Sequence, residues 1–354
     1  MSWTEQDLDA LALRLDPPAD RAAELVYTAG WRQPLVAWLR AAHRDADPLP
    51  DGLPDEVRAF FGIGLPDWAD PHLLQVGQGL FLRYPVPMLQ TLLVRSLPEV
   101  YAGERIAAVL GHTQRLEAGV PRRFGETLQF FFDVASPEGF SPLGRGIRTT
   151  LRVRLLHAAI RRMVPEKNAI NQEDLAATLV TFSAFILQGM ERFGIDLSPE
   201  EEAGWMHLWE VTGALLGLQV RFRDRAEALD FFAHFRRRQQ RKTPHGVALT
   251  KALLAFCDSL LPGTGLDGLN PTVFRFLSGD TLADLLEVGA ADATAVLIGP
   301  YRLLVSSLDE AQDHSALARS LATHVGRAWV QGVIRARLPD GRATFALPEH
   351  LGEG

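Results

Sequence analysis

The chain has 354 residues, of which 47% are hydrophobic and 22% are charged, a composition typical of an ordinary globular protein with a large core. Its formal net charge of −7 argues against nonspecific binding to nucleic acid or to anionic membranes. The single Cys257 excludes an intramolecular disulfide, and no apolar stretch approaches the roughly 18 residues of a membrane span. The N-terminus lacks the basic and apolar regions of an export signal, so we expect a cytoplasmic protein.

The N-terminal part predicts helices over residues 4–44, because the good helix formers Ala, Leu and Arg dominate it. Residues 45–56 hold three Pro and one Gly, which indicates a loop. We therefore expect a helical extension over 1–52, a main domain over 53–290 and C-terminal helices over 291–354 that pack on this domain. Helical patterns dominate throughout and alternating strand patterns are almost absent, so the sequence predicts an all-α fold.

The stretch that carries the most chemistry runs from Pro121 to Met163. An apolar helix comes first, and it holds Arg123 and Thr127 four residues apart, on one face. A loop rich in Pro, Gly and Ser follows, and a second helix then carries His157 on its apolar side. The apolar positions around that histidine recur at helical spacing; they are Val153, Leu156, Ile160 and Val164.

A length argument relates the two helices. Arg123 lies 13 residues before Ser136, where the loop begins, and His157 lies 14 residues after Leu143, where it ends. At about 1.5 Å per residue, both positions stand roughly 20 Å from the turn. If the helices are antiparallel, Arg123, Thr127 and His157 face one gap, in which a flat cofactor such as haem could be ligated by the imidazole. The alternative is a satisfied core histidine beside a surface arginine.

The His157 helix also carries many arginines. One interpretation is a basic face exposed to solvent, and the other is that some of these arginines pair with haem propionates. They are Arg145, Arg148, Arg152, Arg154, Arg161 and Arg162. Residues 172–193 predict one strong helix whose apolar stripe packs on the two preceding helices. A further helix begins after Ser198, with Trp205 and Trp209 on one face.

Two later motifs do not indicate a binding site. Residues 231–242, FFAHFRRRQQRK, indicate a solvated helix end in an acidic protein rather than a nucleic-acid site. Residues 263–268, GTGLDG, match a dinucleotide motif but follow a helix and Pro262 instead of a strand. The sequence also lacks a Gly-x-Ser-x-Gly elbow and a His-Glu-x-x-His zinc helix.

The sequence resembles the rubber oxygenases, or latex-clearing proteins, a family that includes the mycophenolic acid side-chain oxygenase. The resemblance depends on Arg-x-x-x-Thr followed by a haem-ligating His; here Arg123 precedes His157 by 34 residues, since 157 minus 123 is 34. Similar pieces extend over about residues 53–290; they include LPDWADPHLLQVGQGLF at 65–81, SLPEVY at 96–101, VRLLHAAIR at 153–161 and FLSGDTLADLLEVG at 276–289.

This resemblance implies a globin-like helical core, haem b, and O2 chemistry on isoprenoid double bonds. It makes His157 the proximal iron ligand and places Arg123 and Thr127 in the haem pocket. The position of a lysine that can occupy the distal iron site in the best-known rubber enzyme is Glu126 here, so the distal chemistry differs. The position of a glutamate used there as a base is Ala107.

We therefore expect a haem-dependent oxygenase that uses O2 on an apolar, small-molecule substrate, with isoprenoids as one class. Arg123, Thr127 and Glu126 are the candidate catalytic residues. His157 is the candidate iron ligand. The remaining candidate cofactor contacts are Phe131, Val153 and Ile160. A non-catalytic haem binder or sensor, and a helical interaction protein without a cofactor, are the alternatives.

Overall fold

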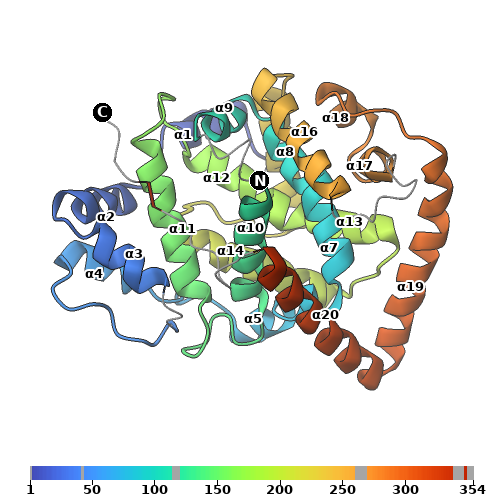
Figure 1. The fold of residues 1–354 in the computed structure, drawn as a ribbon, viewed down its shortest axis with the longest axis horizontal. Coiled ribbons are helices and arrows are strands. Elements are labelled where there is room, and N and C mark those ends of the chain that lie inside the picture. Colours follow the sequence, from blue (N-terminus) through green and yellow to red (C-terminus); the bar gives the residue numbers. More distant parts are fainter. Residues whose placement is uncertain (1, 41–43, 114–119, 260–268, 338–346, 349–354) are drawn as a thin grey trace.

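The computed structural model describes residues 2–40, 44–113, 120–259, 269–337 and 347–348 (Figure 1). Within helices, the side chains of residues 40, 120–124, 269 and 337 are not part of this description. Over the described residues the chain forms helices without a β-strand, and the single extended feature is an isolated bridge between Gly103 and Gln240. The expected all-α fold is confirmed.

Four helices open the chain: α1 (Glu5–Ala12), α2 (Pro17–Thr28), α3 (Arg32–Arg40) and α4 (Asp55–Phe61). Helix α1 begins at a capping box in which the Thr4 hydroxyl accepts from the Asp7 backbone N–H and the Asp7 carboxylate accepts from the Thr4 N–H. Helices α2, α3 and α4 lie together at one end of the molecule, beside the later helix α11 (Figure 1).

Short helices follow: α5 (Pro71–Gly77), α6 (Leu80–Arg83), α7 (Pro85–Thr91), the π-helical η1 (Leu92–Ser96), α8 (Leu97–Tyr101) and α9 (Glu104–His112). Helix α5 crosses α14 (Pro199–Leu215) very closely. A Cβ on Gly77 would lie 2.3 Å from the carbonyl oxygen of Gly204, so only glycine permits this approach.

The two helices expected around His157 are α10 (Val120–Ala135) and α11 (Gly146–Arg161), which pack against each other. The turn between them closes with the Gly146 N–H donating to the Gly139 carbonyl at 2.7 Å. The N-terminus of α11 is capped by a residue about a hundred positions earlier in the sequence. The Asp45 carboxylate accepts hydrogen bonds from the backbone N–H groups of Ile147 and Arg148, at 3.1 and 2.8 Å.

The long helix predicted over 172–193 is instead two helices, α12 (Gln172–Phe182) and α13 (Ala184–Phe193). They break at Ser183, whose ψ of −86° is not helical and whose hydroxyl donates to the Leu179 carbonyl. The Ser183 carbonyl accepts both the Leu187 backbone N–H at 3.4 Å and the indole N–H of Trp205 on α14 at 3.3 Å.

The remaining helices are α15 (Arg225–Gln239), α16 (Pro244–Asp258), α17 (Leu269–Ser278), α18 (Asp280–Leu285), the 3-10 helix η2 (Ala293–Leu297), α19 (Ile298–His314) and α20 (Ala316–Arg337). The basic end of α15 is not simply solvated: Arg238 pairs with Glu173 of α12 and with Glu5 and Asp9 of α1. The GTGLDG motif at 263–268 lies outside the described residues.

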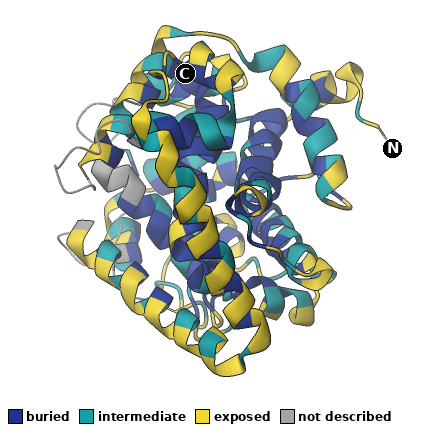
Figure 2. Ribbon diagram, turned by 90° about the vertical axis from the view of Figure 1, so that its right-hand side faces the viewer, coloured by how far each residue is buried: buried dark blue, intermediate teal, exposed yellow. Residues whose placement is uncertain are grey.

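Buried apolar side chains form two clusters, visible as the dark interior of Figure 2. The larger cluster joins most of the helices from α5 to α18, and the smaller joins α2, α3 and α4 to one side of α11. Helix α11 therefore separates the two clusters. Among the described residues, we find no helix that is both long and apolar enough to span a membrane.

Candidate functional site

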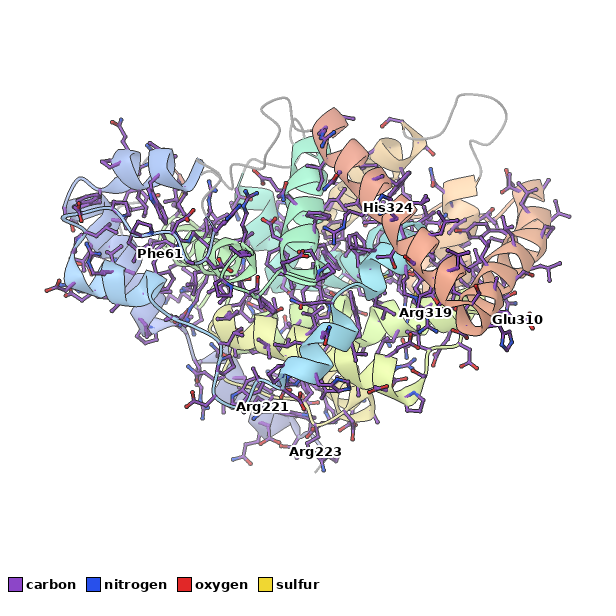
Figure 3. All side chains as sticks on the ribbon, turned by 90° about the horizontal axis from the view of Figure 1, so that it is seen from below. Phe61, Arg221, Arg223, Glu310, Arg319 and His324 are labelled. Carbon is purple, nitrogen blue, oxygen red and sulfur yellow. The ribbon has the colours of Figure 1, made fainter. Side chains whose placement is uncertain are left out.

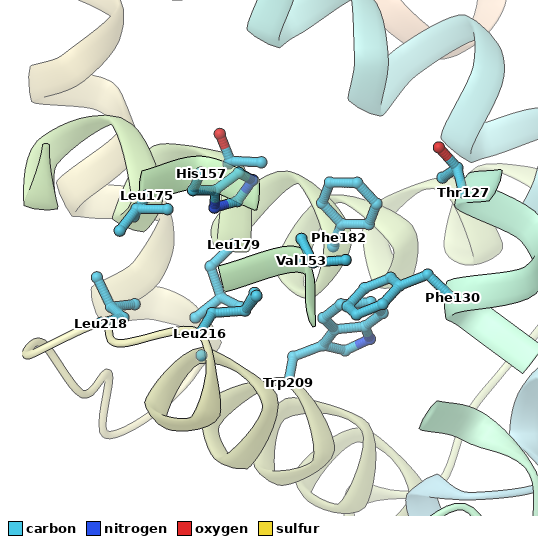
Figure 4. Close-up of a pocket in the computed structure, with 12 residues that line it drawn as sticks. Thr127, Phe130, Val153, His157, Leu175, Leu179, Phe182, Trp209, Leu216 and Leu218 are labelled. Atoms are coloured by element: carbon cyan, nitrogen blue, oxygen red, sulfur yellow. The ribbon is translucent and has the colours of Figure 1, made fainter. Parts of the chain in front are cut away.

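An apolar cavity of about 210 Å³ lies where α10, α11, α12 and α14 meet (Figure 4). Its lining is aliphatic and aromatic, with two hydroxyl groups and one imidazole as the polar side chains. The lining residues are Thr127, Phe130, Val153, His157, Leu175, Thr178, Leu179, Phe182, Trp209, Gly213, Leu216 and Leu218.

The structure brings Thr127 of α10 and His157 of α11 to this one cavity. Figure 4 shows them at opposite ends, with Phe182, Val153 and Phe130 between them. Helices α10 and α11 follow each other across a short loop and pack together, so both residues reach the same cavity.

His157 is held as a neutral imidazole. Burial lowers its pKa to about 4, and the nearby Arg161 cation acts in the same direction, while Asp16 acts weakly against them. Its Nδ1 atom is buried and has no hydrogen-bond partner. At neutral pH the ring therefore keeps a lone pair, which is the form in which histidine binds a metal.

The arginines of α11 fix the helix to the N-terminal extension. Arg154 is buried and makes two bonds to the Asp16 carboxylate, at 2.7 and 2.8 Å, and Arg161 binds Asp20 at 2.6 and 2.9 Å. The expectation of a solvated basic face is therefore wrong for these two residues. Their partners lie more than a hundred positions away along the chain, where no local pattern points to them.

Not all of the other residues predicted to contact the cofactor lie at the cavity. Val153 lines the cavity, and Phe131 lies buried behind the lining, with its ring 4.8 Å from that of Trp209. Ile160 does not reach the cavity and packs instead against the N-terminal cluster. Glu126 is buried on α10, and the side chain of Arg123 lies outside the described part of the chain.

The sequence reasoning missed several lining residues. Thr178 and Gly213 were not singled out, although Thr178 lies one turn from Leu175 on the stripe that was expected to face the cofactor helices. Gly213 allows close packing, since a Cβ there would meet the Leu179 side chain at 2.9 Å. The periodicity of α12 could have identified Thr178, whereas nothing local could have identified Gly213.

Within the described residues, no group of three or more His, Cys, Asp and Glu side chains could hold a metal ion. Ala107 is buried on α9. Glu104 is exposed at the start of the same helix and pairs with Arg241 at 3.2 Å.

Residues 85–309 match the family described as "ER-bound oxygenase mpaB/B'/Rubber oxygenase, catalytic domain". The chain belongs to this family. It is 25% identical over 277 residues to the rubber oxygenase of Streptomyces sp. (strain K30). That match covers 70% of this chain and 64% of the rubber oxygenase, so the chain spans less than two thirds of its relative's length.

The fold is also that of this family. The structure of the latex clearing protein in its closed state superposes with a TM-score of 0.74, over 84% of each chain, at 23% sequence identity. The family match begins at α7 and ends within α19, so it includes all four helices around the cavity. The predicted family resemblance is confirmed.

Proposed function

We propose that this protein is a b-type haem-dependent oxygenase that uses O2 on an apolar small molecule, with isoprenoids as the leading class. The observation that carries the proposal is the neutral, half-buried His157, which faces an apolar cavity together with Thr127 and whose Nδ1 atom is buried. Membership of an oxygenase family supports the reaction class.

The residues fit a haem in two respects. A porphyrin supplies four iron ligands itself, so one imidazole suffices on the protein side, and His157 has a buried nitrogen with no partner in the protein. The apolar lining suits a macrocycle. The volume of about 210 Å³ lies below the roughly 300–1,000 Å³ of typical ligand pockets, so side chains around the cavity must move apart on binding.

When bound, haem would supply the iron at which O2 is activated. The protein's own contribution follows from its lining. His157 would hold the iron, and the Thr127 hydroxyl would offer one hydrogen bond at the far end of the cavity. The surrounding Leu and aromatic side chains exclude water, which strengthens that hydrogen bond and favours an apolar substrate.

Arg123 and Glu126 complete the proposed machinery from the same face and turn of α10. Arg123 would pair with a haem propionate or stabilise negative charge that develops on the oxygen substrate, because guanidinium groups pair strongly with anionic oxygen. Glu126 is a buried carboxyl group next to Thr127 in sequence, and it would provide a polar group in that turn of α10.

An absorption spectrum of the purified, haem-loaded protein, reduced and exposed to CO, tests the proposal. The wild type should show a Soret band that shifts with CO. His157→Ala should lose tight haem binding, whereas His324→Ala, an exposed histidine on α20, should keep it. Unchanged haem occupancy in His157→Ala would remove this residue as the ligand.

The same preparation separates the alternatives. Uptake of O2 that depends on an added isoprenoid supports the oxygenase. A normal CO spectrum without substrate-dependent O2 uptake identifies a haem binder or sensor. Absence of a Soret band after haem feeding identifies a helical interaction protein.

A further inference from the structure

Trp209 contributes a polar group to the cavity that the proposed haem chemistry leaves unused. Its side chain is 1% exposed and lines the cavity from α14. The indole nitrogen can donate one hydrogen bond and accepts none, and it is buried without a partner among the described residues. Because a buried indole N–H usually finds an acceptor, this unpaired donor indicates that an atom from outside the chain completes the site.

Two other tryptophans show how the same group is satisfied elsewhere in the protein. Trp205, one turn earlier on α14, is also buried, and its indole N–H donates to the Ser183 carbonyl at 3.3 Å. Trp68 is half-buried under the guanidinium group of Arg221, which Figure 3 shows at the edge of the molecule, so water can reach its indole N–H. Trp209 has neither a carbonyl partner nor access to bulk water.

The side chains around Trp209 supply no oxygen acceptor. Its ring packs against those of Phe130, Phe131 and Phe182, with centroids 6.0, 4.8 and 5.3 Å away, and an aromatic face is only a weak acceptor. A water molecule needs at least two polar partners to be held in a buried place. An oxygen atom carried by an apolar ligand therefore fits this position better than water does.

We propose that the apolar substrate of this cavity carries one acceptor oxygen, of the ketone, aldehyde or ether class, which receives a hydrogen bond from the Trp209 indole N–H. This inference rests on the proposed function, because it names which substrate the same cavity selects. A plain hydrocarbon would leave the donor unpaired, and a site built to form a hydrogen bond discriminates against an analogue that lacks the acceptor.

The hydrogen bond would also orient the ligand. In the view of Figure 4, the Trp209 nitrogen lies on the side of its ring away from His157. The oxygen-bearing part of the ligand would then be held away from His157, and the hydrocarbon part would lie toward it, among Leu175, Leu179 and Leu218. One fixed donor in an otherwise apolar cavity thus determines which part of an elongated molecule approaches the proposed iron ligand.

Isothermal titration calorimetry of the full, haem-loaded chain tests the proposal with two probes. They are geranylacetone, which is an isoprenoid ketone, and the hydrocarbon in which a methylene group replaces its carbonyl group. In one variant, benzothienylalanine replaces Trp209, which keeps the size of the ring system and puts sulfur in place of the N–H; Trp209→Phe is the second variant. The ratio of the two dissociation constants is compared, because water solvates the ketone better than the hydrocarbon.

Loss of the N–H should weaken binding of the ketone on the order of ten-fold and change binding of the hydrocarbon little. The same replacement at Trp68, which does not line the cavity, is the matched control and should leave both constants unchanged. Equal changes for the two probes in the Trp209 variants overturn the proposal. So does a wild type that binds the hydrocarbon but not the ketone, whatever the stability of the variants.

This test is separate from that of the proposed function. Absence of a Soret band or of substrate-dependent O2 uptake removes the oxygenase, and the ratio is then measured on the protein as purified. An unchanged ratio in a protein that binds haem and consumes O2 removes only the inference about the substrate. Loss of haem from the Trp209 variants with an unchanged ratio assigns the indole N–H to the cofactor instead.

Discussion

The carboxylate of Asp133 on α10 accepts a hydrogen bond of 2.7 Å from the hydroxyl of Thr149 on α11. Gln129, one turn earlier on α10, donates to the other carboxylate oxygen at 2.8 Å. The two helices that bring Thr127 and His157 to the cavity are therefore joined through one buried carboxyl group. Burial raises the pKa of Asp133 to about 6, although both hydrogen bonds act in the opposite direction.

This raised pKa predicts a pH dependence of stability. The unfolded chain ionises Asp133 near pH 3.9, so its contribution is fully present below that pH and is lost as the pH rises through about 6. The loss amounts to roughly 3 kcal/mol. Relative to wild type, Asp133→Asn should therefore gain about that much unfolding free energy between pH 4 and pH 7. Urea titrations at several pH values measure the difference, with exposed Glu56→Gln as the control; a pH-independent difference contradicts the prediction.

His157 predicts the opposite dependence in the cofactor-free protein. Its folded-state pKa of about 4 lies below the unfolded value of about 6.5, so the stability is present above pH 6.5 and is lost as the pH falls through 4. The full effect is roughly 3 kcal/mol. His157→Leu should flatten the acid limb of the stability curve in urea titrations from pH 7 to pH 4, whereas His324→Leu should leave it unchanged. If the unfolding free energies of wild type and His157→Leu fall equally between pH 7 and pH 4, the prediction is wrong, because the pKa of the imidazole is then not lowered on folding.

The buried pair of Asp16 and Arg154 predicts a large loss of stability when one charge is removed. Their side chains are 4% and 9% exposed, so an unpaired Arg154 cation would remain in a dry environment. Asp16→Asn keeps a side-chain cap for α2 but removes the charge, and it should cost about 3 kcal/mol of unfolding free energy. The matched control, Glu24→Gln, removes an exposed partner of Arg21 and should cost less than about 1 kcal/mol. Similar losses for the two variants in urea unfolding would contradict this.

Thr127 and Thr178 both line the cavity, but only one has a hydroxyl proposed for catalysis. The Thr178 hydroxyl already donates to the Asp174 carbonyl at 2.8 Å. Thr127→Val should keep the haem spectrum and reduce substrate-dependent O2 uptake on the order of ten- to hundred-fold, because one hydrogen bond at the reacting end is lost. Thr178→Val should change uptake much less. An equal reduction in both variants would indicate that cavity polarity in general, rather than Thr127, is required.

Local signals in the sequence determined the all-α fold and several helix starts. Thr4, Asn171 and Ser198 cap α1, α12 and α14, and each cap depends on residues at most three positions apart. The sequence also indicated two neighbouring helices joined by a short loop, and Thr127 and His157 on these helices line one cavity.

Tertiary contacts decided the rest. The break at Ser183, the Asp16 partner of Arg154, the placement of Ile160 and the exposed leucines of α20 all depend on which distant segments pack together. An apolar position in a helix looks the same in sequence whether it faces the core, a cofactor cavity or solvent. Its partner is fixed only when residues far apart along the chain exclude water between them.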